Sequence, residues 1–182
     1  MKGTITSGIV GKALILILIA VISISCSQNA EPRFYVDIER DFDVDTTLNG
    51  VVTHFFQLKN VPTKIDQNLD LYGLDKEGIT TISPADAVLT TSTGLMDWSL
   101  VNWVEIYAVS RTDSKLRKQI FYVRERDPNN NDEVRLFNTF ADLSDIMVDE
   151  TIDLEVRFTT IVGVPGYFTG KLLFNYAVFD EL

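Results

Sequence analysis

Apolar and polar residues alternate along most of the chain after residue 33, with the period of two that a half-buried β-strand requires. The alternation is clearest over residues 34–45 and 151–162. The other segments that read as strands are 51–61, 79–91, 100–109, 118–126, 134–138 and 167–179. This pattern predicts an all-β protein of about eight antiparallel strands, arranged as a β-sandwich of Ig-like or jelly-roll-like outline.

One segment changes to the period of a helix. In IDQNLDLYGL (65–74) the apolar residues Ile65, Leu69 and Tyr72 fall at i, i+4 and i+7, and Gly73 can end the helix as its C-cap. We therefore expect a short helix that packs over the end of a sheet.

Several irregularities interrupt the expected strands. Arg40 breaks the apolar face of the first strand, which predicts a bulge or a strand end there. Pro84 predicts an edge or a bulge, because proline cannot donate to a strand ladder. A polar turn at 110–114 joins its neighbouring strands as a hairpin, and residues 141–149 read as a helical turn or a crossing loop.

No shift in composition divides residues 34–182, so the sequence predicts one domain there. In each of the last two expected strands, every second side chain should point into the core. The expected core residues are Ile152, Leu154, Val156, Phe158, Leu172, Phe174 and Tyr176, or their alternates.

The first 25 residues have the pattern of a secretory signal: a basic start, an apolar run over 13–22 and a small-residue exit. Ala13 to Ser25 is 13 residues, whereas a helix that spans a membrane needs roughly 17–25. A permanent transmembrane anchor is therefore the poorer interpretation.

Cys26 ends this segment and is the only cysteine, so it cannot form an internal disulfide. The segment resembles a bacterial lipoprotein signal, which implies a diacylglycerol on Cys26, cleavage after Ser25 and a tether over 26–33. Ser23 and Ile24 depart from the usual aliphatic and small residues, as is common in lipoproteins of the Bacteroidota. The alternative is an ordinary secreted protein with an incidental cysteine.

The body of the chain resembles uncharacterised envelope β-sandwich lipoproteins of the Bacteroidota. The resemblance rests on the pair Tyr72-Gly73, the segment WVEIY (103–107) and the late pair Asp142-Leu143. It implies a fold and a location in the cell envelope, anchored by lipid to the outer membrane. It implies no activity, and it leaves the leaflet orientation and the oligomeric state open.

Charge narrows the range of partners. The formal net charge is −10, and loss of the signal, with Lys2 and Lys12 as its charged residues, leaves −12. A domain this acidic is repelled by nucleic acid phosphates and by anionic headgroups. We therefore expect no nucleic acid partner, and attachment to a membrane must come from the lipid chains.

Two acidic stretches are candidate metal sites. Asp37, Glu39, Asp41, Asp43 and Asp45 line one face of the first strand, where they supply oxygen ligands for calcium or form a solvated edge. Asp127, Asn129, Asn131 and Glu133 alternate in a loop that resembles the start of a calcium loop. That loop has Asp132 and Asn138 where a calcium loop needs Gly and Glu, so we expect no metal or other cofactor.

Aromatic residues suggest a surface for stacking a sugar. Trp98, Trp103, Tyr107 and Tyr122 are the candidates, and Glu105 indicates that Trp103 and Tyr107 share the wetter face of their strand. The alternative is that these aromatic side chains belong to the core or to cross-strand pairs.

No catalytic constellation is evident. His54 lies in an apolar strand, as a packing residue would, and no GxSxG motif occurs. The leading prediction is a non-enzymatic envelope lipoprotein that serves as a binding or structural module for a protein or glycan partner. The alternative is a small lipoprotein hydrolase with a carboxylate-based site. Converging acids in a deep pocket would favour the hydrolase, and an exposed aromatic patch would favour binding.

We predict that the mature protein begins at an acylated Cys26, because a lone cysteine closes an apolar run too short to span a membrane. The intact mass of the protein from the membrane fraction measures this. A mature N-terminus at any other residue, without added lipid mass, would contradict it.

Overall fold

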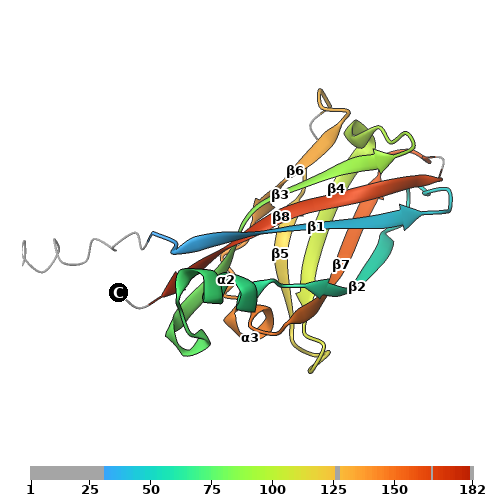
Figure 1. The fold of residues 1–182 in the computed structure, drawn as a ribbon. Helices are drawn as coiled ribbons and strands as arrows, with labels where there is room; N and C mark the ends of the chain where they lie inside the picture. Colours follow the sequence, from blue (N-terminus) through green and yellow to red (C-terminus); the bar gives the residue numbers. More distant parts are fainter. Residues whose placement is uncertain (1–30, 126–127, 165, 181–182) are drawn as a thin grey trace, which may run out of the picture. The chain divides into compact units, whose positions relative to one another are not determined.

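Eight antiparallel strands dominate the computed structural model, which describes residues 31–125, 128–164 and 166–180 (Figure 1). The strands are β1 (Phe34–Val44), β2 (His54–Pro62), β3 (Ile79–Thr93), β4 (Val101–Val109), β5 (Arg117–Val123), β6 (Glu133–Asn138), β7 (Thr151–Thr160) and β8 (Phe168–Asp180). The helical elements of the described residues are α2 (Ile65–Tyr72), α3 (Ser144–Met147) and two short 3-10 turns, η1 (Lys76–Gly78) and η2 (Trp98–Leu100). The prediction of an all-β protein with one or two short helices is confirmed.

All eight strands belong to one sheet in the order β1-β8-β3-β6-β5-β4-β7-β2. The sheet curves into two layers, β1-β8-β3-β6 and β5-β4-β7-β2, with the core between them (Figure 1). Its two edge strands approach each other, since the Arg40 guanidinium of β1 donates to the carbonyl of Lys59 in β2 at 3.3 Å. The architecture therefore combines a sandwich with a nearly closed barrel.

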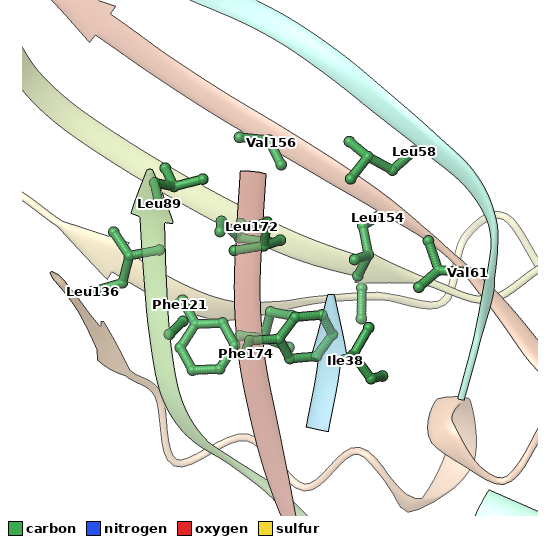
Figure 2. Packing of buried hydrophobic residues seen from close by; sticks show 14 of the residues in the cluster. Ile38, Leu58, Val61, Leu89, Phe121, Leu136, Leu154, Val156, Leu172 and Phe174 are labelled. Atoms are coloured by element: carbon green, nitrogen blue, oxygen red, sulfur yellow. The ribbon is translucent and has the colours of Figure 1, made fainter. Parts of the chain in front are cut away.

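Alternate residues of each strand enter the core, as their sequence period requires. Figure 2 shows side chains from both layers meeting there, with the ring of Phe121 in β5 5.8 Å from that of Phe174 in β8. The expected core is confirmed, because the following residues are all buried: Ile152, Leu154, Val156, Phe158, Leu172, Phe174 and Tyr176.

The prediction of a bulge or strand end at Arg40 is wrong. β1 pairs with β8 in one unbroken register, in which Arg40 lies opposite Leu172. The irregularity lies instead in β2, between Leu58 and Val61, where Asn60 has a positive φ of 55°. Arg40 stays in an extended strand because its long side chain reaches out of the apolar layer to the facing edge strand.

Other local predictions hold. Gly73 ends α2 with a φ of 66°, the left-handed conformation that glycine adopts without steric cost. The register of β3 with β8 shifts between Pro84 and Ala87, which confirms a bulge at the proline. β4 and β5 form the expected hairpin.

The second strand begins at His54, three residues later than the predicted start at 51. The side chain of Asn49 accepts a hydrogen bond from the backbone N–H of Val51 at 3.0 Å. A second bond, from the N–H of Asn49 to Nε2 of His54 at 2.9 Å, closes the turn. These local bonds hold residues 49–53 out of the sheet.

We predict that Tyr176→Phe lowers the free energy of unfolding by about 1–1.5 kcal/mol. The buried hydroxyl of Tyr176 donates to the carbonyl of Thr63 at 2.6 Å, and phenylalanine leaves that carbonyl without this donor. Burial raises the pKa of Tyr176, in keeping with an enclosed hydroxyl. Urea unfolding measures the effect. The exposed Tyr35→Phe is the control and should change stability by less than about 0.5 kcal/mol.

Candidate functional site

Trp103, Glu105 and Tyr107 lie on the outer face of β4, because Val104 and Ile106 occupy its core positions. The strand register brings further side chains alongside them from β2, β7, β5 and β6. We call this surface the aromatic–arginine face. Its residues are Phe55, Trp103, Glu105, Tyr107, Arg117, Tyr122, Phe137, Glu155 and Arg157.

Two guanidinium groups hold the ring of Tyr107. The Cζ of Arg117 lies 3.5 Å from the ring centroid, and that of Arg157 lies 5.0 Å from it. Arg157 also lies 4.9 Å from the ring of Phe55, so its planar group joins aromatic side chains of two strands. The Tyr107 ring is therefore already occupied by cations of the same chain.

A carboxylate fixes both arginines. Glu155 accepts from Nε of Arg117 at 3.1 Å and from Nε of Arg157 at 2.5 Å. The Tyr107 hydroxyl donates to Glu105 at 2.6 Å. The pKa of Tyr107 is raised, mainly by burial of its hydroxyl. The hydrogen bond to Glu105 and the negative charge of that carboxylate add to the effect. The polar groups at the centre of the face are thus held in place before any ligand arrives.

The ends of the face are apolar and exposed. Phe55 is 58% exposed and Phe137 is 64% exposed. The rings of Phe137 and Tyr122 lie 6.0 Å apart, so β5 and β6 together present an aromatic pair. The sequence identified Trp103, Tyr107 and Tyr122, but it missed Phe55 and Phe137, which only strand pairing brings to the same surface.

Trp98 does not belong to this face. It is 1% exposed, and η2 turns its indole into the core beside Phe158 and Phe168. Its Nε1 donates to the hydroxyl of Thr91 at 2.9 Å, which satisfies the one polar group of the side chain. The prediction that Trp98 contributes to a sugar-stacking surface is therefore wrong.

A small hollow lies beside the face, between β5 and β6. Its volume is about 220 Å³, and its apolar walls include Trp98, Val101, Val123 and Val134. No motif in the sequence predicted this hollow, because it depends on how far the two strands diverge.

The predicted acidic row lies on the outer face of β1, on the opposite layer. Asp37, Glu39 and Asp41 are exposed there. Glu39 pairs with Lys171, and Asp41 accepts from Ser92 at 2.9 Å. Nowhere in residues 31–125, 128–164 and 166–180 do three or more His, Cys, Asp or Glu side chains gather as a metal site would require.

The acidic loop is only partly described, and Asp127 lies outside the described residues. The carbonyl of Asn131 accepts from the N–H of Trp98 at 2.9 Å, and the Asn130 side chain accepts from the N–H of Asp132 at 3.3 Å. Asn129 lies in the same loop. These bonds close the loop and hold η2, which is the structural role that its composition also allows.

The predicted lipidation site, Cys26, lies outside the described residues. Among the helices of the described part of the chain, none has the length and apolar character needed to cross a membrane.

Comparisons with known proteins identify no family. No family model matches the chain, and no curated protein matches it. A solved structure of infectious bursal disease virus Gt strain is 16% identical over 86% of this chain and 35% of that chain, with a TM-score of 0.39. This chain thus spans about a third of that longer chain.

Two further virus structures are also similar at a low level. Turnip yellow mosaic virus is 9% identical over 86% of each chain, with a TM-score of 0.32. Desmodium yellow mottle tymovirus is 8% identical over 86% of this chain and 93% of that chain, with a TM-score of 0.25. Values this low carry no information about function.

We predict that divalent metal is not needed for folding, because neither acidic stretch supplies a complete coordination sphere. Chelator should leave the thermal midpoint of residues 27–182 unchanged. Calcium should raise the midpoint no further than sodium chloride of matched ionic strength does, since both screen the carboxylates. Unfolding by chelator, or a rise with calcium well beyond the salt control, would reveal a specific site.

Proposed function

We propose that this protein is a non-enzymatic, lipid-anchored module of the cell envelope that binds a protein partner through the aromatic–arginine face. The observation that carries the proposal is the composition of that face. Tyrosine, tryptophan, phenylalanine and arginine are the residue types enriched in the cores of protein interfaces, whereas lysine and glutamate are depleted. Seven of the nine residues that define the face are of these enriched types. The other two, Glu105 and Glu155, bind the tyrosine hydroxyl and the guanidinium groups.

The geometry favours a protein partner over a glycan. A sugar ring stacks on an open aromatic face, but Arg117 already lies over the ring of Tyr107. The guanidinium groups are held in fixed positions by Glu155, which lowers the entropy lost when a partner orders them. Exposed Phe55 and Phe137 then provide apolar contact at both ends of the face.

The membrane anchor is part of the same proposal and rests on the signal-like segment before Cys26. The net charge of the mature chain would keep the domain itself away from anionic headgroups. A lipid anchor therefore leaves the folded domain free to present its faces to partners.

Photo-cross-linking in intact cells tests the proposed interface. We expect benzoylphenylalanine at position 137 to give one discrete protein adduct, and the same group at position 35, on the exposed outer face of β1, to give none. Phe55→Asp should weaken the adduct at 137 by about tenfold, which corresponds to about 1.4 kcal/mol of binding free energy. The matched control is Leu95→Asp, which changes charge equally at a 94% exposed residue outside the face.

Equal adducts from positions 137 and 35 would contradict the proposal. An equal loss of the adduct at 137 with both aspartate variants would also contradict it. Specific retention of the purified chain on a glycan array, abolished by Phe55→Asp, would assign the face to a glycan instead. Thermal unfolding of each variant shows whether the fold is retained.

A further inference from the structure

The hollow between β5 and β6 arises from a break in strand pairing. β5 and β6 are consecutive strands of a hairpin, yet within the described residues their register contains two pairs, Phe121 with Asn138 and Tyr122 with Phe137. Nearer the loop, residues 133–136 of β6 pair with β3 instead. The two strands therefore diverge where a hairpin would ordinarily continue its ladder.

The space left by this divergence is closed from inside by η2. The backbone N–H of Trp98 donates to the carbonyl of Asn131, and its indole is fixed to Thr91. Val123 and Val134 supply apolar walls from the two diverging strands, and Phe137 lies at the outer margin. The hollow thus has a rigid apolar floor that opens beside the aromatic–arginine face.

Size limits what can enter. Pockets that hold a whole small-molecule ligand usually measure about 300–1,000 Å³, whereas this hollow measures about 220 Å³. A space of that size suits one large side chain of a macromolecule. Interface hot spots are commonly single anchors of this kind, seated in preformed pockets next to an aromatic rim.

Charge limits what can flank the anchor. Glu125, Glu133 and Arg135 line the hollow, and Nε of Arg135 donates to Glu133 at 2.8 Å. This pair compensates itself, and the charge of Glu125 is offset by the adjacent Arg124, whose guanidinium lies 5.7 Å from the ring of Tyr122. The charge that favours basic residues beside the anchor is therefore that of the chain as a whole, which is −10.

We infer that the hollow is the anchor pocket of the protein interface and takes one large apolar side chain, aromatic or aliphatic, from a partner segment with basic residues beside it. This inference rests on the proposed function and adds to it the chemistry of the partner. Tyr122 and Phe137 connect the pocket to the rest of the aromatic–arginine face. The pocket and the face can therefore contact one partner at once.

Selection of a phage-displayed peptide library on the purified full chain tests the inference. Enriched peptides should contain one large apolar residue with Lys or Arg close to it. They should bind the Val134→Trp variant, in which the new side chain fills the pocket, about tenfold or more weaker than the original chain. Phe137→Ala removes a wall without filling the space and should also weaken them. Leu95→Trp, outside the pocket, should not.

Thermal midpoints separate loss of the pocket from loss of the fold, and the Phe137→Ala result decides the matter if Val134→Trp does not fold. The inference is overturned if the selected peptides bind all variants equally. It is also overturned if the peptides carry acidic residues beside the apolar one, or if no peptide is enriched. If the cross-link at position 137 persists in such a case, the proposed function stands and only the anchor pocket is lost. If that cross-link is also absent, the proposed function and the anchor-pocket inference both fail.

Discussion

The burial of alternate side chains between the two layers of one curved sheet is the constraint on which the rest of this structure depends. Because successive residues of a strand point to opposite faces, each inward residue fixes the outward position of its neighbours. In β4, Val104 and Ile106 enter the core, so Trp103, Glu105 and Tyr107 must face out. The aromatic–arginine face is therefore a consequence of core packing.

The curvature of the sheet also brings its two edge strands together and places the junction of its two layers between β5 and β6. β1 and β2 are edge strands that approach each other, and Arg40 spans the gap to the carbonyl of Lys59. On the far side of the sheet, β6 must pair with β3 in one layer and with β5 in the other. The hollow that we assign to an anchor side chain lies where β6, still paired with β3, no longer pairs with β5.

The acidic and aromatic surfaces serve different purposes. On β1 the carboxylates meet Lys171, Ser92 and Thr169 from neighbouring strands, so the row forms polar cross-strand pairs on a solvated face. On β4 and β7 the charges instead hold aromatic rings in place. An edge strand covered with charge also resists pairing with other chains, which suits the exposed position of β1.

The sequence by itself determined the class of fold, the place of most strands, the helix that ends at Gly73 and the bulge at Pro84, because these depend on local periodicity and backbone chemistry. It could not place Trp98, whose burial follows from the path of η2, nor identify Arg40 as a bridge between edge strands. It also could not bring Phe55 and Phe137 to one surface, since β2 and β6 are separated in the chain. Strand order, and the hollow where β5 and β6 diverge, were decided only by the tertiary structure, because many pairings satisfy the same alternation and packing of the whole core selects among them.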